Sequence, residues 1–82
     1  MNLKERVVYK LPNGRELIAR VATGNKTLLC SLSASDEIHY EVSTEGRLFA
    51  HGRLTGWSTD DLSDTARMLS PEDTAQVFAR IT

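Results

Sequence analysis

The sequence predicts an α+β domain, in which a five-stranded antiparallel β-meander is followed by two short C-terminal α-helices that pack on the sheet. Turn-forming residues divide residues 5–57 into five runs of strand-like composition. Serine residues followed by acidic residues then open two helical segments within residues 58–82. The 82 residues suit a single domain, residues 1–82.

Four breaks separate the strand-like runs, of which the first is Glu5–Leu11 and the last is Arg47–Trp57. Gly, Pro, Asn and Asp dominate these breaks, and tight turns favour the same residues. The breaks are Pro12-Asn13-Gly14, Gly24-Asn25, Ala34-Ser35-Asp36 and Thr44-Glu45-Gly46.

The loop lengths predict a register for each pair of neighbouring runs. The expected opposite pairs are Tyr9 with Leu17, Ala19 with Cys30, Cys30 with Tyr40, Leu28 with Val42, and Val42 with Leu48. These registers place the apolar residues on one shared face, and a slip of one residue would move a whole strand to the other face. Gly52 and Gly56 in the fifth run allow a strongly curved sheet or half-barrel as the alternative to an open one.

Both helical segments carry start signals. Ser58 is expected to cap the first helix, with Asp61 three residues later and with Trp57 and Leu62 as a hydrophobic staple. Ser70 is expected to cap the second helix, with Pro71 at its first position. The apolar residues of the second helix are Ala75, Val77, Phe78 and Ile81.

Composition excludes several classes of protein. The formal net charge is −1 and 40% of the residues are hydrophobic, which is typical of an ordinary globular domain. No apolar leader segment or run of roughly 20 apolar residues is visible, so we expect no membrane association. The single cysteine, Cys30, excludes an internal disulfide, and we expect a cytoplasmic protein.

The predicted registers bring Ser31, His39 and His51 into one row on the polar face, beside Glu37, Glu41, Phe49 and Arg53. A first interpretation is a metal site formed by the histidines and a glutamate, but no metal-spacing motif supports it. A second is a Ser31–His39–Glu41 hydrolase, which lacks a nucleophile elbow and a pocket. We therefore expect no metal, no cofactor and no enzymatic activity.

The third interpretation is a partner-binding surface, and it is the leading one. His39, Phe49, His51 and Arg53 resemble the composition of a protein interface. An apolar spot formed by Val8, Ile18 and Leu29 is expected on the same face. We expect either a helix or another chain to cover it. Together with unpaired edge strands, these features predict a small protein-interaction module that self-associates as a homodimer.

The uneven charge supports an alternative function. Residues 1–30 contain six basic and two acidic residues, and Arg6, Lys10 and Arg20 are expected on one face of the first two strands. A basic sheet face can bind phosphates or nucleic acid. The competing explanation is that the basic and acidic halves of the chain complement each other within one fold.

Overall fold

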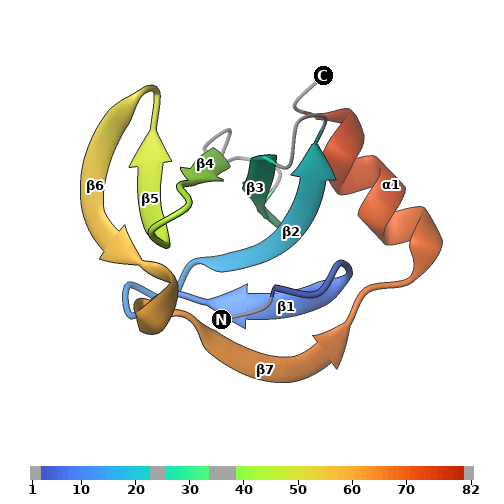
Figure 1. The fold of residues 1–82 in the computed structure, drawn as a ribbon. Helices are drawn as coiled ribbons and strands as arrows, with labels where there is room; N and C mark the ends of the chain where they lie inside the picture. The colour runs from blue at the N-terminus through green and yellow to red at the C-terminus, as the bar shows by residue number, and fades with distance from the viewer. Residues whose placement is uncertain (1–2, 23–25, 34–38, 81–82) are drawn as a thin grey trace.

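The computed structural model describes residues 3–22, 26–33 and 39–80 of the chain. Within these residues, seven strands form one antiparallel sheet that curls strongly, and one α-helix lies outside the curl (Figure 1). The sheet order is β6-β5-β4-β3-β2-β1-β7. The elements are β1 (Val7–Lys10), β2 (Glu16–Ala22), β3 (Lys26–Ser31), β4 (His39–Val42), β5 (Arg47–Ala50), β6 (Arg53–Ser58), the 3-10 helix η1 (Thr59–Asp61), β7 (Ser63–Met68) and α1 (Pro71–Ala79).

The α+β class and the antiparallel sheet are confirmed, but the expected count of five strands is wrong. The fifth run, expected as one strand, is the hairpin β5–β6. His51 and Gly52 form its two-residue turn, and both have positive φ, at 53° and 75°. A turn of this type usually announces itself as Asn-Gly or Asp-Gly, so His-Gly did not signal it.

The expected first helix is also wrong, because only one turn of it forms. The Ser58 N–H donates to the Asp61 carboxylate at 2.9 Å, as the capping signal predicted, but η1 ends at once. The following residues pair with the open edge of β1 as β7, with Asp64 opposite Tyr9. A short isolated helix is marginal in water, whereas pairing with an existing strand adds ladder hydrogen bonds directly.

The second helix begins as expected. The Ser70 hydroxyl accepts a hydrogen bond from the Asp73 N–H at 3.1 Å, and Pro71 opens α1. Thr74 and Val77 are its buried residues, while Ala75, which was expected on the apolar face, is exposed. Ile81 lies outside the described residues.

The registers are right for β1–β2 and β4–β5 and wrong for β3 on both sides. Leu29, not Cys30, lies opposite both Ala19 and Tyr40. The run from Leu28 to Cys30 is apolar at every position, so alternation cannot tell its two faces apart. The two turns expected to set this register, Gly24-Asn25 and Ala34-Ser35-Asp36, lie outside the described residues.

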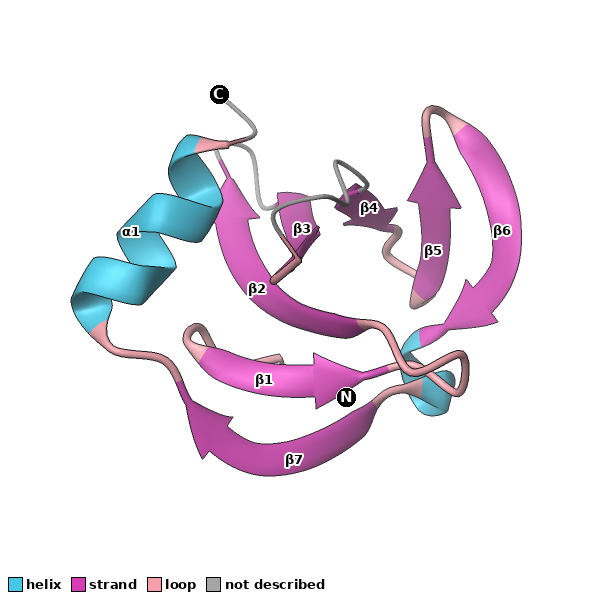
Figure 2. Cartoon of the chain, turned by 180° about the vertical axis from the view of Figure 1, so that it is seen from behind, coloured by secondary structure: helices cyan, strands magenta, loops and turns pink. Residues whose placement is uncertain are grey.

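The register of β3 is shifted by one residue from the predicted register. As a result, the central strands bury side chains on both faces of the sheet. The inner core, inside the curl, consists of Val7, Tyr9, Leu11, Leu17, Ala19, Leu29, Tyr40, Leu48 and Leu62. On the outer face, Val77 of α1 packs with Val8, Ile18 and Cys30. Figure 2 shows α1 on the outside of the curl, beside β2. One helix therefore covers the β1–β3 part of the outer face.

Gly46 provides a test of the link between the β4–β5 turn and η1. Its φ is +82°, its carbonyl accepts from the Thr59 N–H at 2.8 Å, and a Cβ would lie 2.9 Å from Thr59 Oγ1. Gly14 also has positive φ, at +89°, but a Cβ there would meet nothing within 4 Å. Both alanine substitutions incur about 1–2 kcal/mol of backbone strain, and only Gly46→Ala adds a clash with a buried side chain.

We therefore predict that Gly46→Ala lowers the free energy of unfolding more than Gly14→Ala does. Urea denaturation of the two variants and the parent chain measures the difference. Equal losses at the two positions would contradict the close approach of Gly46 to Thr59.

Candidate functional site

α1 leaves part of the outer face uncovered. We call this part the open face; it consists of the outward-pointing residues His39, Glu41, Phe49 and Leu54. Leu28 borders it and packs against the cluster under α1. Direct cross-strand pairs set Leu28 opposite Glu41, Glu41 opposite Phe49, and Phe49 opposite Leu54. Because directly opposite residues in a sheet share a face, these pairs form one continuous row across β3, β4, β5 and β6.

The open face has an apolar centre. Phe49 is half-buried and belongs to neither of the two cores, and Leu54 is 52% exposed. A hollow of about 620 Å³ lies beside Phe49. Its lining residues are Lys26, Glu41, Val42, Ser43, Thr44, Phe49 and Gly52. The hollow and the exposed leucine provide a place for a large apolar side chain of a partner.

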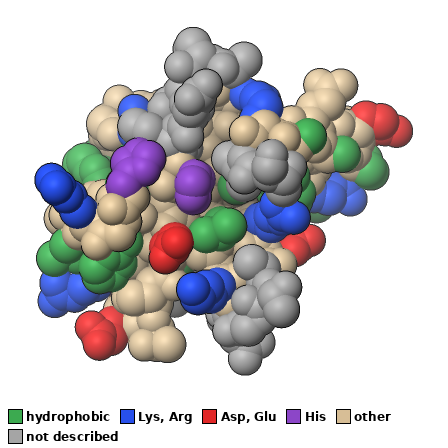
Figure 3. All heavy atoms as spheres, turned by 90° about the horizontal axis from the view of Figure 1, so that it is seen from above, with side chains coloured by type: hydrophobic (Ala, Val, Ile, Leu, Met, Phe, Trp, Pro, Cys, Tyr) green, Lys and Arg blue, Asp and Glu red, His purple; other side chains and the backbone are tan. Residues whose placement is uncertain are grey.

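The two histidines of the chain lie side by side at this face (Figure 3). His39 is on β4 and His51 is in the β5–β6 turn, and their ring centroids are 6.5 Å apart at an interplanar angle of 65°. The Nδ1 atom of His39 is buried and has no hydrogen-bond partner among the described residues. The proximity of the two rings agrees with the register predicted for β4 and β5.

Among the described residues, basic side chains outnumber acidic ones along the open face. Lys26 on β3 is exposed, and Arg20 lies at the covered end of the row, with its guanidinium carbon 5.3 Å from the centroid of the Phe78 ring. Glu41 is the acidic residue of the row and is exposed. The described residues of the row and its rim therefore carry a net positive charge.

Three of the seven predicted partner-binding residues come together here: His39, Phe49 and His51. Arg53 is exposed at the start of β6, but it lies opposite Ala50, which packs against the inner core. The other three are fully buried at 0% exposure. Val8 and Ile18 lie under α1, and Leu29 points into the inner core. Those three residues offer no surface to a partner. Of the two covers expected for the apolar spot, a helix or another chain, the structure shows a helix, α1.

The basic residues Arg6, Lys10 and Arg20 do not form one open patch. The Arg6 side chain donates through Nε to the Leu69 carbonyl at 2.9 Å, and the Leu69 N–H donates back to the Arg6 carbonyl at 2.8 Å. Arg20 lies over α1, as described above. Lys10 is exposed on β1 opposite Glu16. Two of the three guanidinium or ammonium groups thus serve the attachment of the helical segment.

The Ser31–His39–Glu41 arrangement, which the predicted registers allowed but which was not favoured, does not form. Ser31 lies opposite Leu17 and is 6% exposed, on the face of the sheet away from His39. This correction follows from the slip of β3. Within the described part of the chain, no group of three or more His, Cys, Asp or Glu side chains is placed to hold a metal ion.

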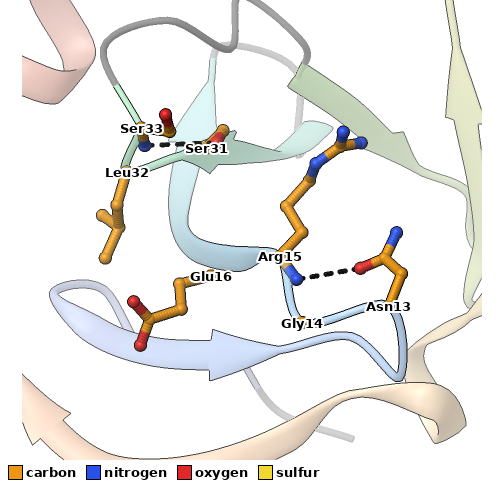
Figure 4. A pocket seen from close by; sticks show the side chains of 7 residues that line it. All are labelled: Asn13, Gly14, Arg15, Glu16, Ser31, Leu32 and Ser33. Carbon is orange, nitrogen blue, oxygen red and sulfur yellow. Dashed lines mark hydrogen bonds between the residues drawn. The ribbon is translucent and has the colours of Figure 1, made fainter.

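A second hollow, of about 590 Å³, lies between the β1–β2 turn and the end of β3 (Figure 4). The Arg15 N–H donates to Asn13 Oδ1 at 2.9 Å, and the Arg15 guanidinium donates to the Tyr40 hydroxyl. The Glu16 carboxylate lies 2.9 Å from Arg67. The principal charged groups of this hollow are thus already engaged within the fold, so we assign it no ligand.

Sequence reasoning missed Lys26, Leu28 and Leu54 as members of the site or its rim. Both leucines were expected in the core. Leu28 moved outward because β3 slipped, and Leu54 moved outward because the hairpin at His51-Gly52 restarts the alternation. A turn prediction at His51-Gly52 was the one signal that could have identified Leu54.

Cys30 borders the site, since it lies opposite His39 under α1. Burial raises the pKa of the Cys30 thiol from 9.0 to about 11, and the nearby Arg20 charge lowers it only in part. The thiol is therefore protonated at neutral pH, which argues against a nucleophile or a thiolate ligand.

This burial predicts slow alkylation of Cys30. At mildly alkaline pH the thiolate fraction is about a hundredfold below that of a thiol with the ordinary pKa, and α1 also blocks access. Iodoacetamide labelling should be slow in the folded chain and should accelerate as the pH rises toward about 11. Stability is unaffected while both the folded and unfolded thiols are protonated, and it falls between pH 9.0 and about 11, where only the unfolded thiol ionises.

Mass spectrometry of the labelled chain measures the rate. Val77→Ala should accelerate labelling by loosening α1, whereas Val21→Ala, at a position that is 57% exposed on β2, should not. A labelling rate that stops rising near pH 9 would contradict the buried thiol.

No helix among the described residues is long and apolar enough to span a membrane. In comparisons with family models, curated proteins and solved structures, the chain matches none. The site is therefore interpreted from its own residues. Two features require explanation: the row around Phe49, which no described helix covers, and the pair formed by His39 and His51.

Proposed function

We propose that this chain is a non-enzymatic protein-interaction module whose open face binds an acidic segment of another protein. The observation that carries the proposal is the uncovered row that ends in Phe49 and Leu54. An accessible aromatic side chain beside basic residues is typical of protein interfaces. The acidic segment would place an apolar side chain against Phe49 and its carboxylates against the basic rim.

Magnitudes indicate a weak, transient complex. Phe49 and Leu54 are already partly buried, so completing their burial would contribute less than the roughly 1.5–3 kcal/mol of a fully exposed side chain each. Association itself costs about 4–15 kcal/mol in lost motional freedom. The apolar contacts alone do not offset that cost, so charge pairs and hydrogen bonds at the rim must supply the rest. Partners held in this way belong to the small-interface class.

Charge favours an acidic partner over a second copy of the chain. Among the described residues, Lys26 and Arg20 lie along the open face, against the carboxylate of Glu41. Two open faces packed on each other would bring like charges together, which is unfavourable when water is excluded. A partner with carboxylates around an apolar side chain avoids that cost.

The edge strands favour the same conclusion. Gly56 in β6 and Ala66 in β7 both have positive φ, at 88° and 61°. The β5–β6 and β1–β7 ladders each contain a register shift. Bulges of this kind bend an edge away from an incoming strand. Self-association through a free edge is therefore disfavoured, and the side chains of the open face are the better surface.

The proposal predicts charge-selective binding of a defined peptide. The probe is a synthetic peptide in which Phe and Leu alternate with Glu and Asp, titrated into the isotope-labelled chain and followed by NMR. Saturable shifts should centre on His39, Glu41, Phe49 and Leu54. The same peptide with Lys in place of the acidic residues should bind at least about tenfold more weakly. No shift on the open face, or equal binding of both peptides, would contradict the proposal.

Matched variants locate the binding. Phe49→Ser should weaken the acidic peptide roughly tenfold, about 1.4 kcal/mol. Met68→Ser, at a position that is 61% exposed on β7, should leave binding unchanged. Binding of a labelled oligonucleotide at low salt, in preference to the peptide, would replace the proposal with nucleic-acid binding. If light scattering showed a dimer and Phe49→Ser abolished it, the open face would bind a second copy of the chain. That result would contradict the proposed acidic partner.

A further inference from the structure

We propose that His39 and His51 supply two protein ligands of a surface site for a divalent transition-metal ion of the zinc class. Neutral imidazole nitrogen is a preferred ligand of zinc, nickel and copper. The inference is independent of the proposed function, because it depends only on the two rings and their surroundings. It revises the expectation from the sequence, in which no spacing motif suggested a metal.

The distance between the rings is close to what one shared ion requires. An ion that binds one nitrogen of each ring at about 2.0–2.1 Å holds the ring centroids roughly 5–6 Å apart. The observed separation is 6.5 Å, with the rings inclined by 65°. A small rotation of one side chain closes the difference, and His51 is exposed and has room to rotate.

The backbone at His51 supports a role beyond the fold. Its φ of 53° lies in the left-handed region, next to Gly52 at 75°. Asn is the residue that a turn of this type prefers at the first position. A histidine there carries some backbone strain, and it places an imidazole directly beside His39. Strain of this kind tends to occur at functional positions.

His39 supplies a second, separate observation. Its Nδ1 atom is buried and makes no hydrogen bond with any described residue, so no described group occupies this nitrogen. A buried polar atom without a partner is uncommon and calls for an explanation such as a bound ion. If Nδ1 binds the ion, Nε2 is the ring nitrogen that remains to donate to an acceptor.

The protein does not complete the site alone. Among the described residues, no third His, Cys, Asp or Glu is placed to join the pair. Cys30, which lies opposite His39, is buried under α1. Water, or a carboxylate from a bound partner, would take the remaining positions. The site is therefore a two-histidine surface site, not a structural zinc centre.

The test is a titration of the untagged chain with zinc chloride, and separately with nickel chloride, followed by calorimetry and by the histidine ring signals in NMR. We expect one ion per chain and shifts of both histidine rings. His51→Asn suits the left-handed turn and removes one ligand, so it should keep the fold and weaken binding at least about tenfold. His39→Gln should do the same.

Glu45→Gln serves as the control, because Glu45 is exposed and is not part of the pair. It should bind the ion as the parent chain does. The proposal is overturned if neither ion binds, if only one ring responds, or if binding survives His51→Asn unchanged. Binding that is lost in Glu45→Gln but kept in His51→Asn would place the ion elsewhere and would also overturn it.

Discussion

The packing of α1 on the outer face of β1–β3 is the contact on which the rest of the structure depends. Val77 covers Val8, Ile18 and Cys30, all of which are nearly inaccessible to water. Burying such side chains contributes roughly 1.5–3 kcal/mol each, a large share of what an 82-residue chain can command. With both faces of β2 and β3 buried, Leu28 and Cys30 can point outward without penalty. The position of α1 thus decides which half of the face is covered and which half is open.

Much of the fold was predictable, and the failures have identifiable causes. Turn chemistry located the first four strands, and the Ser70-Pro71 signal located α1. Alternation failed at β3, because three consecutive apolar residues fit either face. The helix signal at Ser58 does start one helical turn. The residues after that turn pair with β1 instead, which is a tertiary effect that no local sequence pattern shows. The turn at His51-Gly52 was missed because the usual hairpin signal is Asn-Gly or Asp-Gly, although histidine also tolerates a left-handed position.

The site was predictable where the registers were right. The β4–β5 register was right, so His39, His51 and Phe49 were correctly expected together. The β3 register was wrong, so Ser31 and Leu29 were expected on the open face but lie on the inner one. The structure also separates two roles that the sequence could not. Arg6 secures the helical segment, Arg20 lies between α1 and the open face, and Lys26 lies on the open face itself.

The register of β3 is the central claim, since it divides the covered half of the outer face from the open half. Side-chain NOEs in a methyl-labelled sample test it most directly. The account predicts NOEs from the Leu29 methyls to the Tyr40 ring, and from the Val77 methyls to Ile18. NOEs from Leu28 to the Tyr40 ring, together with NOEs from Leu29 to Val77, would contradict it. In that case the row that defines the open face would not exist.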